Sequence, residues 1–221
     1  MRYVEKGPEP KELTQFRASI LSTPGVGAVP YDEMTAETKS AIMRQCLAEQ
    51  GYLCAYTGLR IEAGTSHLEH MYPRSQGEAR ESLAYWNLVA CYPGPGEKNP
   101  GFGALLKANW PTVEERSIFV RPTDESCENR FAYDREGTIQ PKDPGDAAAK
   151  TTIQALNLCH EDLKRYRNEA WQETTDEFSS LAALRHRLSG LDEPSNGRLE
   201  PLCFVKKHAL QRKLEKLRQF R

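Results

Sequence analysis

The segment between residues 51 and 110 constrains the fold most, because helical patterning stops there. The stretch before it, "TAETKSAIMRQCLAEQGY", predicts a helix that Thr35 caps and Gly51 ends, with apolar side chains on one face. Inside the segment, short apolar and aromatic runs alternate with Gly and Pro, as in "CYPGPGEKNPGF". Such runs form short strands and turns. We therefore predict a mostly helical α+β fold around a small β-containing insert.

The remaining patterns divide the chain into four parts. A helix is expected after the prolines of "GPEPKELTQFRAS", and a loop in "STPGVGAVPYDEM". Strands are predicted in "IFVRP" and "RFAYDREGTIQP", and helices in 146–157 and 159–190, with Asn157 as a cap of the second. The predicted parts are an N-terminal helical segment (1–50), the insert (51–110), further strands and helices (111–200) and a C-terminal helix (201–221).

The C-terminal segment is strongly basic, although the whole chain has a net charge of −1. From residue 204 to 221 it contains seven Lys or Arg and one acid, with Phe204, Leu210, Leu214 and Leu217 at helical spacing. This pattern predicts a basic amphipathic helix. Two roles are open for it: a solvated helix that closes the fold, or a helix that contacts phosphate groups.

The chain has no sequence signal for a membrane or for secretion. No apolar run approaches the roughly 18 residues that a membrane span needs, and "MRYVEKGPEP" has no apolar signal core. We therefore expect a cytoplasmic protein with no membrane partner. Its six cysteines are widely spaced, and disulfides are rare in that compartment, so most are expected to be buried apolar residues.

Two histidines and an acid lie within four positions of "SHLEHMYPRSQG", namely His67, Glu69 and His70. The stretch is either a polar turn or the centre of a metal site. A nuclease that uses one metal ion needs such groups. It requires a divalent ion on the scissile phosphate, oxygen or imidazole ligands for that ion, and a neutral imidazole that takes a proton from water. A further group orients the imidazole and fixes its tautomer.

The pattern "HLEHMYPRSQG…LAYWNLVAC" resembles the HNH nuclease motif, whose fold is the ββα-metal fold. The resemblance implies an HNH nuclease core at 51–110, in which His70 is the general base and Glu69 is a metal ligand. It also implies that Asn87 pins the following loop and orients His70 through backbone contacts. Because adjacent residues of a strand face opposite sides, the use of both Glu69 and His70 requires a kinked backbone.

Five further positions complete the candidate site. His67 is either an additional metal ligand or a structural residue, and Asn99 is the nearest candidate for a third ligand, with Asn109 farther along the chain, after "GALLK". Arg74 is a candidate for nucleic-acid binding or an ion-pair partner of Glu69. Lys98 and Lys107 are candidates for phosphate contact or ordinary surface lysines. Such a site would hold one Mg²⁺ or Mn²⁺ ion, and Mg²⁺ usually keeps several of its waters.

The resemblance extends beyond the motif. Together, "MRYVEKGPEP", "GYLCAYTG", "HLEHMYPRS", "YWNLVAC", "CENRFAYDREGTIQP" and "TIQALNLCHEDLKRYR" resemble the Septu and retron-associated HNH endonucleases, from the first residue to about Arg167. In that family an HNH subunit works with an SMC/ABC-like ATPase in bacterial antiphage defence. The resemblance therefore implies a nucleic-acid substrate and an ATPase partner.

The cysteines depart from the pattern of that family, which usually holds a structural zinc between two Cys-x-x-Cys-like pairs. Here Thr57 stands three residues after Cys54, and no second cysteine follows Cys91 in "YPGPGEKNPGFGALLK". Two thiolates cannot complete a four-thiolate site, so we predict no structural zinc. Packing is expected to replace it, by Tyr52, Leu53, Tyr56, Tyr85 and Trp86.

These features leave several functions open. The first is a metal-dependent HNH endonuclease that acts on DNA or RNA. The alternative is a catalytically decayed HNH fold that binds or regulates an ATPase complex, in line with the missing cysteines. A zinc-dependent regulator of DNA binding is disfavoured by the same loss. Non-specific affinity for nucleic acid comes mostly from neutralised phosphates. Because this chain is close to neutral, we expect its partner to provide much of the affinity for nucleic acid.

Overall fold

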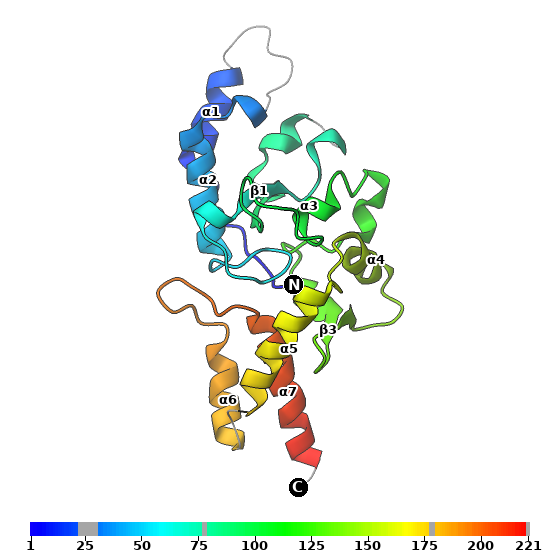
Figure 1. The fold of residues 1–221 in the computed structure, drawn as a ribbon. Coiled ribbons are helices and arrows are strands. Elements are labelled where there is room, and N and C mark those ends of the chain that lie inside the picture. The colour runs from blue at the N-terminus through cyan, green and yellow to red at the C-terminus, as the bar shows by residue number, and fades with distance from the viewer. Residues whose placement is uncertain (22–30, 77–78, 177–179, 220–221) are drawn as a thin grey trace.

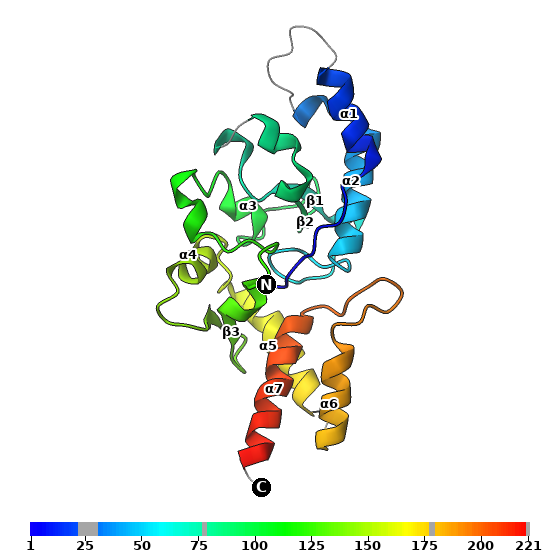
Figure 2. The same cartoon turned by 180° about the vertical axis from the view of Figure 1, so that it is seen from behind.

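The computed structural model describes residues 1–21, 31–76, 79–176 and 180–219. The fold is α+β and mostly helical, as predicted, and Figures 1 and 2 show it from two sides. The strands form two separate antiparallel pairs, β1 (His67–His70) with β2 (Leu88–Cys91) and β3 (Phe131–Tyr133) with β4 (Ile139–Pro141). The helices are α1 (Lys11–Leu21), α2 (Ala36–Glu49), α3 (Ala104–Lys107), α4 (Ala147–Ala155), α5 (Glu161–Asp176), α6 (Leu181–Gly190) and α7 (Cys203–Gln219).

The molecule is elongated, with two groups of elements at opposite ends. Helices α1 and α2 lie beside the β1–β2 pair and α3 in the upper part of Figure 1, and α5, α6 and α7 lie side by side in the lower part. The N-terminus lies where the two groups meet, and the C-terminus lies at the far lower end. Among the described residues, no helix combines the length and apolarity that a bilayer crossing requires.

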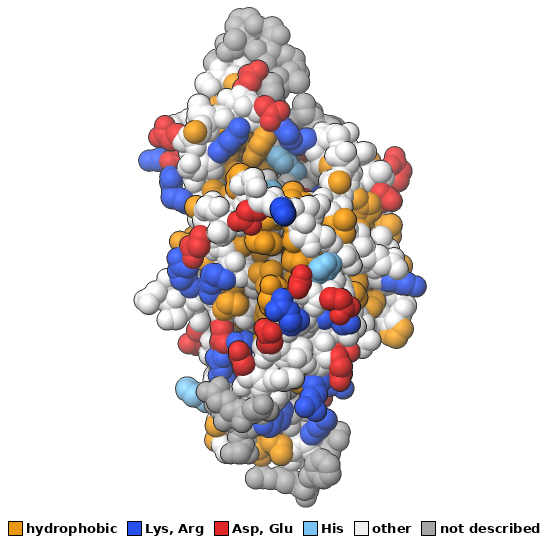
Figure 3. Space-filling model, in the orientation of Figure 1, with side chains coloured by type: hydrophobic (Ala, Val, Ile, Leu, Met, Phe, Trp, Pro, Cys, Tyr) orange, Lys and Arg blue, Asp and Glu red, His pale blue; other side chains and the backbone are white. Residues whose placement is uncertain are grey.

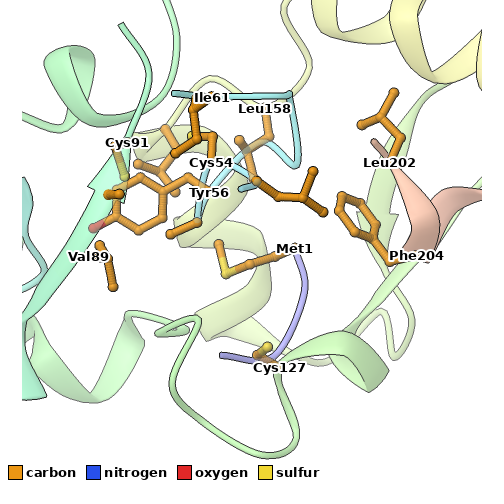
Figure 4. Packing of buried hydrophobic residues seen from close by; sticks show 14 of the residues in the cluster. Met1, Cys54, Tyr56, Ile61, Val89, Cys91, Cys127, Leu158, Leu202 and Phe204 are labelled. Carbon is orange, nitrogen blue, oxygen red and sulfur yellow. The ribbon is translucent and has the colours of Figure 1, made fainter. Parts of the chain in front are cut away.

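A continuous cluster of buried apolar side chains joins the two groups. Figure 4 shows Met1 between Val89 of β2 on one side and Phe204 of α7 on the other. Leu53, Tyr56 and Tyr85 belong to this cluster, as predicted, but Trp86 is 43% exposed. Its ring packs edge-on against Tyr72 near the surface, with the centroids 5.9 Å apart.

Helix α2 begins and ends as its sequence predicts, and its end is tied to β2. The Thr35 hydroxyl accepts a hydrogen bond from the Thr38 amide at 3.1 Å, and Gly51 has a φ of 57°. The side chain of Gln50 then binds Ala90 on both sides, since its Nε2 donates to the Ala90 carbonyl and its Oε1 accepts from the Ala90 amide. Gln50 therefore makes the two hydrogen bonds to Ala90 that a neighbouring strand would otherwise make along this edge of β2.

Two other predictions for local structure, a strand at "IFVRP" and a cap at Asn157, were wrong. "IFVRP" forms no strand, because the Val120 amide donates to the Thr152 hydroxyl of α4 instead of a neighbouring strand. Asn157 does not cap α5; it has a φ of 44°, and its amide donates to the Gly101 carbonyl at 2.8 Å. The predicted helical region 159–190 forms two helices, α5 and α6. Most of the predicted loop at 22–34 lies outside the described residues, and 31–33 form a short 3-10 turn.

The C-terminal helix is amphipathic, as its spacing predicts, with Leu210 and Leu214 buried against the other helices. An ion-pair network fixes its start. Glu200 binds Arg187 of α6 and Lys206 of α7, each at 2.6 Å. Burial acts to raise the pKa of Glu200, but the hydrogen bonds from Arg187 and Lys206 outweigh it and hold this pKa below 4.5.

We expect Glu200→Gln to lower the free energy of unfolding by about 1–2 kcal/mol at pH 7, because charge-assisted hydrogen bonds are lost. Since the folded pKa is lowered, the carboxylate stabilises the fold above pH 4.5, and this contribution disappears as the pH falls through the folded pKa. Urea titrations at a series of pH values measure the difference from wild type. A difference that does not shrink below pH 4.5 would contradict the assignment.

The turn between β3 and β4 packs directly on α5. Gly137 has a φ of 79°, and a Cβ atom added there would lie 2.0 Å from the Lys164 carbonyl oxygen. We expect Gly137→Ala to cost about 3 kcal/mol or more, the sum of left-handed strain and overpacking. Gly197 is the matched control, with a φ of 74° and no heavy atom within 4 Å of an added Cβ. Gly197→Ala should cost about 1 kcal/mol in the same urea titration, and equal losses would contradict the packing argument.

Candidate active site

His70 ends β1, and its ring is held in one orientation by the backbone. Its Nε2 lies 2.9 Å from the Ser82 carbonyl oxygen, which can only accept, so Nε2 carries the hydrogen and Nδ1 carries the lone pair. Tyr31 packs edge-on against the ring at 4.7 Å. Burial lowers the pKa of His70, so the imidazole is neutral near pH 7. Nδ1 has no hydrogen-bond partner among the residues that the structure describes.

Asn87 is fully buried and fixes the backbone that carries these contacts. Its Oδ1 accepts a hydrogen bond from the Tyr72 amide at 2.7 Å. Its Nδ2 donates to the carbonyls of Tyr72 and Glu81 at 2.9 and 3.2 Å. The two ends of the segment between β1 and β2 are therefore clamped together. Ser82, whose carbonyl holds His70, directly follows one of these clamped residues.

A polar hollow of about 550 Å³ opens beside His70. Its lining includes Tyr31, Glu69, Arg74 and Asn109. Arg74 pairs with Asp32 at 2.9 Å, and both side chains are largely exposed, so a ligand can compete for this arginine at little cost. The hollow therefore combines a neutral imidazole, a carboxylate and an available guanidinium.

His67 and Glu69 are two residues apart in β1 and therefore share one face of the strand, and Glu69 also lines the hollow beside His70. His67 Nδ1 lies 2.6 Å from the Pro93 carbonyl oxygen, so Nδ1 donates and a neutral ring has its lone pair on Nε2. That Nε2 lies 3.8 Å from Glu69 Oε2. Burial acts to lower the pKa of His67, but the bonds to Glu69 and Pro93 outweigh it and raise the pKa.

This pair fits a divalent cation in its donor chemistry. An imidazole nitrogen and a carboxylate oxygen point toward one another, and the other imidazole nitrogen is bound to a carbonyl, which is how proteins orient metal-binding histidines. Two protein ligands leave several coordination positions for water or phosphate. Nowhere in the described ranges do three or more His, Cys, Asp or Glu side chains come together in a metal-binding group.

The prediction that Lys107 contacts phosphate was wrong, and so was the alternative of a surface lysine. Lys107 is only 3% exposed, at the end of α3. Its ammonium donates to the carbonyls of His70, Met71 and Trp110 at 3.1, 3.3 and 2.8 Å. It also lies 2.9 Å from Glu69 Oε1. Lys107, and not Arg74, is therefore the ion-pair partner of Glu69.

The structure does not bring Asn99 and Lys98 into the hollow. Both lie in the exposed Gly/Pro loop after β2, where Asn99 Oδ1 accepts a hydrogen bond from the Gly101 amide at 2.9 Å. Asn109 lines the hollow instead, and its Oδ1 accepts a bond from the Ser75 hydroxyl at 3.1 Å. Of the two candidate asparagines, the more distant Asn109 therefore lies at the hollow and Asn99 does not.

Cys54 and Cys91 meet in the core beside β2, as Figure 4 shows. Burial acts to raise the pKa of the Cys54 thiol, but hydrogen bonds from Cys91, Thr57 and the Tyr92 amide outweigh it and lower the pKa to about 6. Thr57, which stands where a second cysteine was looked for, therefore contributes a hydroxyl to this group. That the chain needs no structural zinc stays a prediction.

Sequence reasoning missed the contacts that orient both histidines. They come from the backbone carbonyls of Ser82 and Pro93, and every residue type has such a group, so no sequence signal identifies them. Tyr31 was passed over because it lies in the loop-like stretch before α2. Lys107 was misplaced because a lysine next to two leucines reads as the solvent-facing side of a helix.

Comparison with curated proteins finds a similar protein in Vibrio cholerae serotype O1 biovar El Tor, named as a candidate HNH endonuclease of retron Vc95. The two chains are 28% identical over 124 residues. The match covers 52% of this chain and 57% of that protein, so this chain spans little more than half of the relative's length. No family model matches the chain. The similarity agrees with the motif in "HLEHMYPRSQG…LAYWNLVAC".

We expect Asn87→Ala to lower the free energy of unfolding by about 2–4 kcal/mol, because it removes a fully buried side chain and leaves three partly buried backbone groups without this partner. Asn99→Ala, in the exposed loop, is the control and should change the free energy by less than about 0.5 kcal/mol. Urea unfolding followed by circular dichroism measures both. If the two variants lost equal stability, Asn87 would not be the clamp described above.

Proposed function

We propose that this chain is an HNH-type endonuclease subunit that hydrolyses phosphodiester bonds of nucleic acid, with His70 as the general base. The observation that carries the proposal is the His70 ring. Its Nε2–H is held by the Ser82 carbonyl and its Nδ1 lone pair is unpartnered among the described residues, beside a polar hollow. A base needs this combination of a fixed tautomer, a neutral ring and access to a reactant.

In this proposal Nδ1 of His70 takes a proton from a water molecule as its oxygen attacks the phosphorus atom. The bond from phosphorus to the leaving sugar oxygen breaks, and that oxygen takes up a proton from solvent. The Ser82 carbonyl accepts from Nε2–H throughout and stabilises the positive ring that forms. Arg74 is the side chain at the hollow that can exchange its carboxylate partner for the phosphate.

His67 and Glu69 are the residues that would hold a divalent ion, Mg²⁺ or Mn²⁺. When bound, such an ion neutralises charge on the phosphate and the leaving oxygen. The Pro93 carbonyl fixes the tautomer of His67 for this role. Glu69 provides the carboxylate, one oxygen of which faces His67.

The proposal includes a bacterial antiphage defence system and an SMC/ABC-like ATPase subunit as partner. The name of the relative and the longer sequence resemblance support this context. The charge distribution supports the need for a partner as well. Figure 3 shows acidic and basic side chains interspersed over one face of the molecule, with no broad basic surface there for a nucleic-acid backbone.

One observation favours the alternative, a catalytically decayed subunit that binds or regulates its ATPase partner. The Lys107 ammonium already neutralises Glu69, at 2.9 Å, as a metal ion would. A site that supplies its own cation can keep its fold after the nuclease activity is lost. The two functions differ in one measurable property, which is the cleavage of nucleic acid.

We expect the purified protein to cut plasmid DNA or total RNA with Mg²⁺ or Mn²⁺, in the presence or absence of an SMC/ABC-like ATPase. His70→Ala should reduce the rate by about 100-fold or more, since general base catalysis contributes about that much. His186→Ala, at an exposed position on α6, is the matched control and should cut like wild type. Equal cutting by His70→Ala would reject His70 as the base. No cutting by wild type, even with the ATPase, would favour the decayed subunit.

A further inference from the structure

Helix α3 buries a charged side chain and exposes apolar ones, which is the reverse of an ordinary amphipathic helix. It buries Lys107, at 3% exposed, and leaves its neighbours Leu105 and Leu106 about 40% exposed. Ala104 is the one apolar residue of α3 that is buried, so apolar burial by this helix is small. The surroundings of the lysine must therefore match it, because a buried ammonium is costly unless its charge and its protons are matched.

The surroundings of the Lys107 ammonium match both. Its three protons are directed at three backbone carbonyls, those of His70, Met71 and Trp110. Glu69 Oε1 is the fourth oxygen, at 2.9 Å, and it has no hydrogen-bond partner of its own. The carboxylate is thus paired by charge, while the protons serve the carbonyls. The ammonium nitrogen lies 2.8–3.3 Å from these carbonyl oxygens, as expected for hydrogen bonds. A bound magnesium ion would need its oxygen ligands closer, at ~2.1 Å.

We propose that Lys107 is an internal cation that occupies the Glu69 carboxylate, and that a divalent ion binds the site fully only when Lys107 leaves it. This inference rests on the proposed metal site of His67 and Glu69. A divalent ion between His67 Nε2 and Glu69 Oε2 would lie a few ångströms from the ammonium on Oε1, and two positive charges at that separation repel. The ion-free site is therefore stable and closed, and release of Lys107 is a step that controls the loading of the ion.

The proposal has two consequences for the binding of Mn²⁺. Removing the positive charge of Lys107 should strengthen binding, because repulsion is lost and the partly buried Glu69 carboxylate is left without a counter-charge. Filling the site with Mn²⁺ in the wild-type chain should expel the lysine from its carbonyl cage. A lysine with a purely structural role would give weaker binding on removal and would stay buried.

We expect Lys107→Met to bind Mn²⁺ about tenfold or more tightly than wild type in calorimetric titrations, since repulsion between nearby charges is strong even at the dielectric of a protein surface. Its melting temperature without the ion should be lower, and Mn²⁺ should raise it by more than in wild type. Lys98→Met makes the same change at an exposed position and should bind like wild type. Glu69→Gln should abolish binding with either residue at 107.

A second measurement uses the wild-type chain, in case Lys107→Met does not fold. Reductive methylation followed by mass spectrometry should leave Lys107 unmodified without the ion and modify it at saturating Mn²⁺, while Lys98 is modified in both. Binding by Lys107→Met that is equal to or weaker than wild type, or a Lys107 that stays protected at saturation, would overturn the inference. Either result leaves the nuclease proposal intact, because that proposal depends on cleavage and its loss in His70→Ala.

Discussion

The buried ammonium of Lys107 is the interaction on which the geometry of the candidate site depends. It ties together the end of β1, the residue after it and the turn after α3, through the carbonyls of His70, Met71 and Trp110. Because β1 has only four residues, few ladder hydrogen bonds hold its end. Three charge-assisted bonds to one ammonium supply that restraint, and they also fix Glu69 by its charge.

Asn87 likewise restrains the backbone, on the other side of His70. Its amide closes the segment between the strands by binding Tyr72 and Glu81, and the carbonyl of Ser82 then meets His70 Nε2. The site is thus built on backbone carbonyls and amides that two buried polar side chains position. Such a design needs very little regular structure, but each of the two side chains must be fully satisfied, since a half-satisfied buried network is costly.

The sequence was informative where local patterns decide the structure. Thr35 and Gly51 bounded α2, the spacing of Leu210 and Leu214 predicted α7, and the helical and β-like stretches gave the fold class. It failed where a long-range contact decides. Two of the three carbonyls that bind Lys107 lie more than 30 positions away, and the Val120 amide binds a hydroxyl on α4, and no local pattern encodes these contacts.

The candidate site shows the same division. The motif identified His70 and Glu69, which lie on β1 and line the hollow, and Asn87, which directly precedes the paired strand β2. It placed Asn99 wrongly, since the Gly/Pro loop after β2 has no such fixed path, and Asn109 lines the hollow instead. A motif therefore predicts the residues on regular elements better than those on the loop that closes the site.

The two halves of the basic C-terminal helix differ in how their basic side chains are paired. Lys206 and Lys207, in its first half, are bound to Glu200 and Asp192, so their charges hold the helical group together. Arg212, Lys216 and Arg218, in its second half, have no carboxylate partner in the part of the chain that the structure describes. Since α7 ends at the opposite end of the molecule from β1, any phosphate bound there would lie far from His70. A nucleic acid held at both places would have to run along the length of the molecule, which is a further reason to expect that a partner completes the binding surface.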